Sequence, residues 1–151
     1  MVQNTLALRE DIVRLIRKHR PTAVITQNPT TRWSGNYVNH PDHRNTGDAT
    51  LDAVFPSARD VHMFPHLVSE EGLYPHVVEH LYVGARDDSA NVYFDVEATV
   101  GTKIAALKAH KSQMMNVGAG FDQRIRQGLI GNGEPKGIGY AESFKYFYLG
   151  D

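Results

Sequence analysis

Residues 12–26 read IVRLIRKHRPTAVIT, and this stretch decides the fold class of the 151-residue chain. One helical face is formed by Leu8, Ile12, Leu15 and Ile16. Asn4 or Thr5 can cap this helix, and Pro21 ends it after a basic last turn. Residues 23–26 then predict a short strand that is covered on both faces, as in parallel sheets. A helix followed by a buried strand predicts an α/β architecture.

Composition excludes several kinds of partner and site. The 16 basic and 17 acidic residues leave a formal charge of −1, so we expect no nucleic acid and no anionic membrane surface as partner. The chain contains no cysteine, which excludes disulfides, thiolate metal ligands and a cysteine nucleophile. Any metal would have imidazole and oxygen ligands. The length matches one domain over residues 1–151, and the absence of signal-peptide and membrane-spanning patterns predicts a cytoplasmic protein.

Residues 27–45 are polar and read as a long loop after the strand. Loops of this length are usually functional or disordered, and Trp33 and Tyr37 favour the functional alternative. The loop would leave the carboxyl end of the strand, where open α/β sheets bind ligands. Thr46 is the expected cap of the next helix, which Pro56 should kink or shorten.

Within this loop, His40-Pro41-Asp42-His43 places two imidazoles and a carboxylate in four residues. These groups can bind a metal ion and transfer protons, so the motif predicts a metal-assisted hydrolytic site. A surface turn is the alternative, in which Pro41 fixes φ and Asp42 bonds to the backbone. The four residues by themselves leave both alternatives open.

The remaining pattern alternates between strands and helices. Strands are expected at 77–78, 80–83 and 92–94, and the longest helix from about Val96 towards Met114. His110 lies on the apolar stripe of that helix, as a core histidine or a site residue. A weaker helix is expected over 121–130 and a turn-rich break over 131–137, while residues 140–149 fit helix or strand equally well.

Two further pairs of side chains have both a functional and a purely structural interpretation. His62 and His66 have a spacing that could bind a metal on a helix, but Pro65 lies between them and favours a surface location. Trp33 and Tyr37 could stack on a sugar ring or anchor the long loop.

Four stretches together resemble one protein family. His40-Pro41-Asp42-His43-Arg44, followed by Thr46-Gly47 and a helix, resembles the second signature of the PIG-L/LmbE family of zinc-dependent N-deacetylases. Residues 15–26 resemble the helix and strand that lead into it. Residues 103–113 resemble a late helix ending in His-x-Ser-Gln, and residues 141–144 resemble the closing Ala-Glu-x-Phe. The resemblance runs from about the first helix to the last residues of the chain.

The resemblance implies a partial Rossmann-like α/β/α fold with a mainly parallel sheet. The family's first signature, Ala-His-Pro-Asp-Asp-Glu, has no counterpart before His40, so the chain resembles a C-terminal portion without the first βα units. By resemblance, His43 is a zinc ligand, while His40, paired with Asp42, polarises the substrate carbonyl or handles the proton of the leaving amine. The resemblance assigns no substrate-binding residue.

The implied function is the C-terminal portion of a zinc-dependent de-N-acetylase for N-acetylated amino-sugar conjugates. One ligand cannot form a zinc site, so we expect weak or absent activity alone, and a homo-oligomer or a completing N-terminal partner, as in a split enzyme. The alternative is a non-catalytic module that binds carbohydrate or protein.

Overall fold

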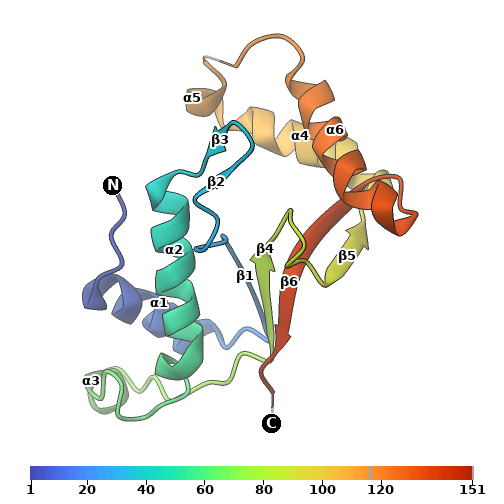
Figure 1. The fold of residues 1–151 in the computed structure, drawn as a ribbon. Coiled ribbons are helices and arrows are strands. Elements are labelled where there is room, and N and C mark those ends of the chain that lie inside the picture. The colour runs from blue at the N-terminus through green and yellow to red at the C-terminus, as the bar shows by residue number, and fades with distance from the viewer. Residues whose placement is uncertain (116, 151) are drawn as a thin grey trace. The chain divides into compact units, whose positions relative to one another are not determined.

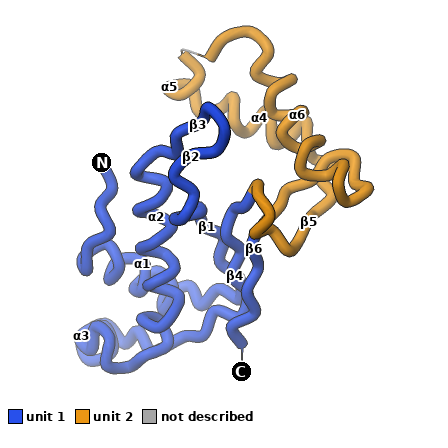
Figure 2. The backbone as a smooth tube through the Cα atoms, viewed as in Figure 1, with its two compact units in different colours: residues 1–85, 145–151 blue, residues 86–144 orange. Residues whose placement is uncertain are grey.

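The computed structural model describes residues 1–115 and 117–150. Its contacts divide the chain into two compact units, shown in different colours in Figure 2. Unit 1 comprises residues 1–85 and 145–151, and unit 2 comprises residues 86–144. The single domain expected over residues 1–151 stays a prediction. No helix of the described ranges is long and apolar enough to cross a membrane.

Unit 1 begins with the helix and strand that the sequence predicts. Helix α1 spans Leu6–His19, and the Thr5 hydroxyl caps it by accepting a hydrogen bond from the Leu8 amide. Strand β1, Ala23–Thr26, pairs in parallel with β4, His80–Gly84. In the strand order, β4 lies between β1 and β6, Ala141–Tyr148. Parallel strands beside α1 and α2 (Figure 1) confirm the predicted α/β class.

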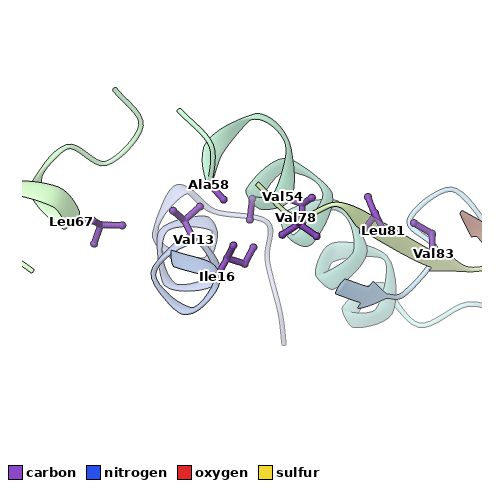
Figure 3. Close-up of a cluster of buried hydrophobic side chains, with 9 residues drawn as sticks. Val13, Ile16, Val54, Ala58, Leu67, Val78, Leu81 and Val83 are labelled. Carbon is purple, nitrogen blue, oxygen red and sulfur yellow. The ribbon is translucent and has the colours of Figure 1, made fainter. Parts of the chain in front are cut away.

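One face of β1 and β4 carries the core of unit 1. Figure 3 shows this cluster, which includes Val13, Ile16, Val54, Ala58, Leu67, Val78, Leu81 and Val83. Side chains alternate along a strand, so Val24 packs against the cluster while Ile25 points the other way and is 69% exposed. The prediction that both faces of β1 are covered is therefore wrong within the described chain. Leu15 is also exposed, and Val13 takes the core position.

The chain between β1 and the next helix is shorter and more ordered than predicted. Strands β2, Trp33–Ser34, and β3, Tyr37–Val38, form a small antiparallel hairpin. Helix α2 spans Pro41–Asp52, so it begins five residues before the expected cap at Thr46. Proline is well suited to the first helical position, where its missing N–H has no intrahelical partner to lose. The His40–His43 motif consequently lies at the start of a helix.

After α2 the chain leaves regular helical geometry, as expected at Pro56. A π-helical segment η1, Ala53–Ser57, contains Phe55 at φ −141° and a cis peptide bond before Pro56. A short helix α3, His66–Ser69, follows. Residues 77–78 are not in a strand, because β4 begins only at His80.

Unit 2 contains a small helical core and a two-stranded pairing. Strand β5, Val92–Asp95, pairs antiparallel with the first half of β6. The helices are η2 Glu97–Thr99, α4 Val100–Ala109, α5 Lys111–Met114, α6 Phe121–Gly133 and η3 Glu134–Lys136. Their core is Val100, Ile104 and Leu129. The single long helix predicted over 96–114 is wrong, because the backbone leaves the helical region at His110, with ψ 68°.

Gly47 brings α2 close to the backbone of the segment that follows β1. A Cβ at this position would lie 2.5 Å from the Gln27 carbonyl oxygen and 3.0 Å from the Pro29 nitrogen. Both neighbours are backbone atoms, so alanine fits only if α2 moves. We expect Gly47→Ala to lower the free energy of unfolding by about 1–3 kcal/mol, measured by chemical denaturation.

The matched control for this substitution is Gly128→Ala in α6. A Cβ there meets nothing within 4 Å, so the higher helix propensity of alanine should raise stability by about 0.5–1 kcal/mol. Gly47→Ala also gains helix propensity, and only the steric contact reverses its sign. Two variants with the same stabilising shift would contradict the close approach.

Candidate functional site at the start of helix α2

His40 is the N-cap residue of α2. Its backbone is extended, with φ −61° and ψ 138°, and its Nδ1 atom accepts a hydrogen bond from the Asp42 amide at 3.1 Å. This contact takes up one of the amide donors that every helix leaves without a partner at its start. The remainder of the imidazole is exposed, so His40 is both a helix cap and an accessible side chain.

His43 lies one turn further along the same helix. Its ring centroid is 5.8 Å from that of His40, and the two ring planes are tilted by 54°. The His43 Nδ1 atom lies 3.2 Å from Oδ1 of Asn39. The structure therefore brings together the two imidazoles that the sequence singles out.

Asp42 is held by the N-terminal segment of the chain. Its Oδ1 atom accepts a hydrogen bond from the Val2 amide at 2.9 Å, and the Asn45 side chain donates to the Val2 carbonyl at 2.7 Å. The other carboxylate oxygen lies 3.7 Å from Nδ1 of His40, an ion pair only when that imidazole is protonated. The roles predicted for Asp42 and His40 stay predictions.

Asn39 is a residue of this site that sequence reasoning misses. Its side chain is buried, with 8% exposure, and its Nδ2 atom donates to the Thr31 carbonyl at 2.9 Å. Its Oδ1 atom also accepts from the Tyr37 hydroxyl at 3.3 Å. The available signal is its spacing, because Asn39 stands four residues before His43, where side chains at a helix start can meet.

The hairpin beside this helix start presents two aromatic side chains. Trp33 is 70% exposed and Tyr37 is also exposed, although the Tyr37 hydroxyl reaches Asn39. Neither ring belongs to the core of unit 1. Trp33 therefore does not anchor the hairpin in the core of unit 1.

The other singled-out histidines have different surroundings. His66 contacts Glu10 at 2.9 Å, and together with Arg14 it holds the pKa of the Glu10 carboxyl below its usual range. His62 is exposed and does not share this contact. His110, in unit 2, is exposed at the junction of α4 and α5, so it is not a core histidine.

The side chains at the start of α2 are the candidates for a group of metal ligands. Among residues 1–115 and 117–150, no three His, Asp or Glu side chains are grouped so that they could hold a metal ion. A catalytic zinc site usually has three protein ligands and one open position. The zinc ligand role predicted for His43 stays a prediction.

Comparison with known proteins gives one similar curated sequence. The chain is 29% identical over 144 residues to diacetylchitobiose deacetylase of Thermococcus kodakarensis, a match that covers 94% of this chain and 51% of that protein. The chain therefore spans about half the length of this relative. No protein-family model matches the chain.

Solved structures share the fold. The N,N'-diacetylchitobiose deacetylase from Pyrococcus horikoshii, complexed with its inhibitor MPG, superposes with a TM-score of 0.83 at 22% identity, covering 96% of this chain and 52% of that one. The conserved protein TT1542 from Thermus thermophilus gives a TM-score of 0.73 at 21% identity, covering 99% and 62%. This chain has the α/β fold of these proteins, as a portion of their length.

A third structure shows that proteins with a different activity also match this fold. GalB from Pseudomonas putida, a 4-carboxy-2-hydroxymuconate hydratase, superposes with a TM-score of 0.62 at 14% identity, covering 96% of this chain and 60% of that one. A hydratase and a deacetylase therefore both match this fold, and function must be argued from the site.

Proposed function

We propose that this chain is part of a de-N-acetylase that acts on N-acetylated amino sugars. The observation that carries the proposal is the adjacent pair of imidazoles at the start of α2, with ring centroids 5.8 Å apart and the Asp42 carboxylate beside them. Sequence similarity to a diacetylchitobiose deacetylase over 94% of the chain supports the same reaction class. A small amino-sugar substrate and membership of the PIG-L/LmbE family are parts of this proposal.

Zn²⁺ is the proposed cofactor, with His43 as one of its ligands. The Nδ1 atom of His43 is engaged by Asn39, and this contact leaves the Nε2 atom on the far side of the ring to bind a ligand. Metal-binding histidines commonly hold their second nitrogen by such a contact to an oxygen. Bound zinc would supply a Lewis acid and lower the pKa of its water to about 7.

His40 and Asp42 would act on the substrate rather than hold the metal. The exposed His40 ring could polarise the amide carbonyl or pass a proton to the departing amine. Asp42, anchored by the Val2 amide, would lie beside the His40 ring, with a carboxylate oxygen 3.7 Å from its Nδ1 atom. We assign no substrate-binding residue.

The proposed activity requires donors beyond those that the described residues group together. We propose that these donors come from another segment or chain, either a second copy or a completing N-terminal partner. The uncovered face of β1, with Ile25 at 69% exposure, is consistent with a further layer of structure against unit 1. The chain alone would then be weak or inactive.

The test is metal analysis of the purified chain together with turnover of N,N'-diacetylchitobiose and N-acetylglucosamine. We expect substoichiometric zinc and little acetate release from the chain alone, and both should rise when a completing partner is supplied. Stoichiometric zinc with rapid deacetylation by the monomer would contradict the proposal that the chain alone forms an incomplete site. Failure of every completed assembly to release acetate would overturn the reaction class.

A carbohydrate-binding module is the second candidate, and the exposed Trp33 ring favours it. An accessible aromatic face is a common platform for a sugar ring. Titration with chitobiose in the presence of EDTA separates the two candidates. Binding that survives the chelator and is lost in Trp33→Ala would favour the module, whereas binding that depends on added Zn²⁺ would favour the enzyme.

A further inference from the structure

We propose that Asn39 is a positioning residue that sets His43 in the Nδ1–H tautomer, opposite to the tautomer of its neighbour His40. The two rings would then present different atoms to a ligand, a bare Nε2 on His43 and an Nε2–H on His40. The use of this arrangement in catalysis depends on the proposed function. The tautomers themselves follow from hydrogen bonds within unit 1.

The tautomer of His43 follows from two successive hydrogen bonds, the first of which is accepted by the backbone carbonyl of Thr31. The Thr31 oxygen can only accept a hydrogen bond, so the Asn39 atom 2.9 Å from it must be the amide nitrogen. The other atom of that amide is therefore the carbonyl oxygen, which also only accepts. Nδ1 of His43, 3.2 Å from this oxygen, must carry the proton. Neutral His43 consequently has a lone pair on Nε2.

The tautomer of His40 follows from the opposite kind of backbone group. The Asp42 amide can only donate, and it points at Nδ1 of His40 from 3.1 Å. This nitrogen must therefore be unprotonated in the neutral ring, which places the proton on Nε2. Two imidazoles 5.8 Å apart are in this way fixed in opposite states by groups whose roles cannot reverse.

Asn39 is held firmly enough to impose this choice. Its side chain is almost fully buried, its own backbone amide donates to the Arg32 carbonyl at 2.9 Å, and its backbone carbonyl accepts from the Arg44 side chain. Tyr37 donates to the same Oδ1 atom as His43 does. Turning the side-chain amide over would place its oxygen against the Thr31 carbonyl oxygen, two acceptors that cannot bond to each other, so one orientation is strongly preferred.

The arrangement suits the division of labour in the proposed enzyme. A histidine that binds a metal ion needs a lone pair on the ligating nitrogen, and His43 has one at Nε2. A group that stabilises a developing oxyanion needs a hydrogen-bond donor, and His40 has one at Nε2. Asn39 would thus act through His43 without touching the substrate.

Long-range ¹H–¹⁵N correlation spectra of the ¹⁵N-labelled chain test the proposal directly, because they distinguish protonated from bare ring nitrogens. At pH 8, above the ordinary histidine pKa of about 6.5, we expect His43 to show the Nδ1–H pattern and His40 the Nε2–H pattern. Spectra of His43→Gln and His40→Gln assign the two signal sets. A wild-type His43 that shows the Nε2–H pattern would overturn the proposal whatever the variants do.

Three substitutions separate positioning from simple structural support. Asn39→Leu removes the acceptor, so His43 should shift towards the Nε2–H form that free imidazole side chains prefer. Asn39→Asp keeps an acceptor oxygen and should retain the Nδ1–H pattern. Tyr37→Phe removes only the second donor and is the matched control. An unchanged His43 pattern in Asn39→Leu would show that another group sets the tautomer.

The spectra need neither zinc nor turnover, so their outcome is independent of the activity assays. If the Asn39→Leu chain does not fold, comparison of the wild type with Asn39→Asp and Tyr37→Phe still tests whether the Asn39 oxygen sets the tautomer of His43. Loss of the Nδ1–H pattern in Asn39→Asp would contradict the role of the Asn39 oxygen. Correct tautomers together with failure of every completed assembly to release acetate would retain the positioning and reject the proposed function.

Discussion

Replacing Arg17 by methionine is expected to lower the free energy of unfolding by about 2–4 kcal/mol, more than most single substitutions. Arg17 is 2% exposed and lies on the core side of α1 beside Val13 and Ile16. Methionine keeps most of the apolar stem but removes every donor. The cost therefore measures the hydrogen bonds of the guanidinium rather than the loss of volume.

Those hydrogen bonds hold the irregular chain that follows α2. The Arg17 Nε atom donates to the Ala58 carbonyl at 3.2 Å. Its Nη2 atom is shared by the carbonyls of Ser57 at 3.1 Å, Asp60 at 2.8 Å and Met63 at 3.0 Å. Burial lowers the pKa of the guanidinium, and the nearby Asp60 charge opposes that shift. Without Arg17, buried carbonyls lose their partners, and such groups cost more than a hydrogen bond gains.

Urea denaturation of the parent, Arg17→Met and Arg17→Lys measures the effect. Lysine keeps the charge but has one compact ammonium group in place of the planar guanidinium with its several donors. The stability of Arg17→Lys should therefore fall between that of the parent and that of Arg17→Met. Lys18→Met, at an exposed position on the same helix, is the control and should change stability by less than about 0.5 kcal/mol. An Arg17→Met chain as stable as the Lys18→Met chain would contradict the role of these bonds.

Arg17 also illustrates what the sequence cannot predict. The run of basic residues after Ile16 fits the carbonyl end of a helix, and α1 does end there at His19. Periodicity nonetheless treats arginine as a surface residue. Its burial depends on the course of the chain after Asp52, because four backbone carbonyls between Ser57 and Met63 accept hydrogen bonds from its guanidinium. Only the tertiary structure brings these segments together.

The sequence predicts the residues of the site but not its local structure. Two histidines and an aspartate within four residues are visible in the sequence, and a helix start brings the imidazoles side by side. The polar composition around Pro41 favours a loop, yet this proline is the first residue of α2. Asn39 escapes sequence reasoning because its partners, Thr31 and Tyr37, reach it through the hairpin.

The second large effect concerns catalysis and distinguishes the two imidazoles. In an assembly that releases acetate, we expect His43→Gln to lower both bound zinc and turnover, the latter by at least about 100-fold. His40→Gln should lower turnover by a similar factor, about 100-fold, while zinc content stays at the parent level. The reason is that His43 is the proposed ligand, whereas His40 uses Nδ1 to cap α2 and leaves only its outer nitrogen for the substrate.

Zinc content and turnover must be measured on the same preparations, with His62→Gln as the control at an exposed histidine outside the site. Circular dichroism should first establish that α2 persists in His40→Gln, since the substitution also removes the N-cap acceptor, worth about 1 kcal/mol. Zinc loss in both variants would mean that His40 is a ligand as well. Parent-level turnover in His43→Gln would exclude His43 from the metal site and leave the hairpin as the better candidate for function.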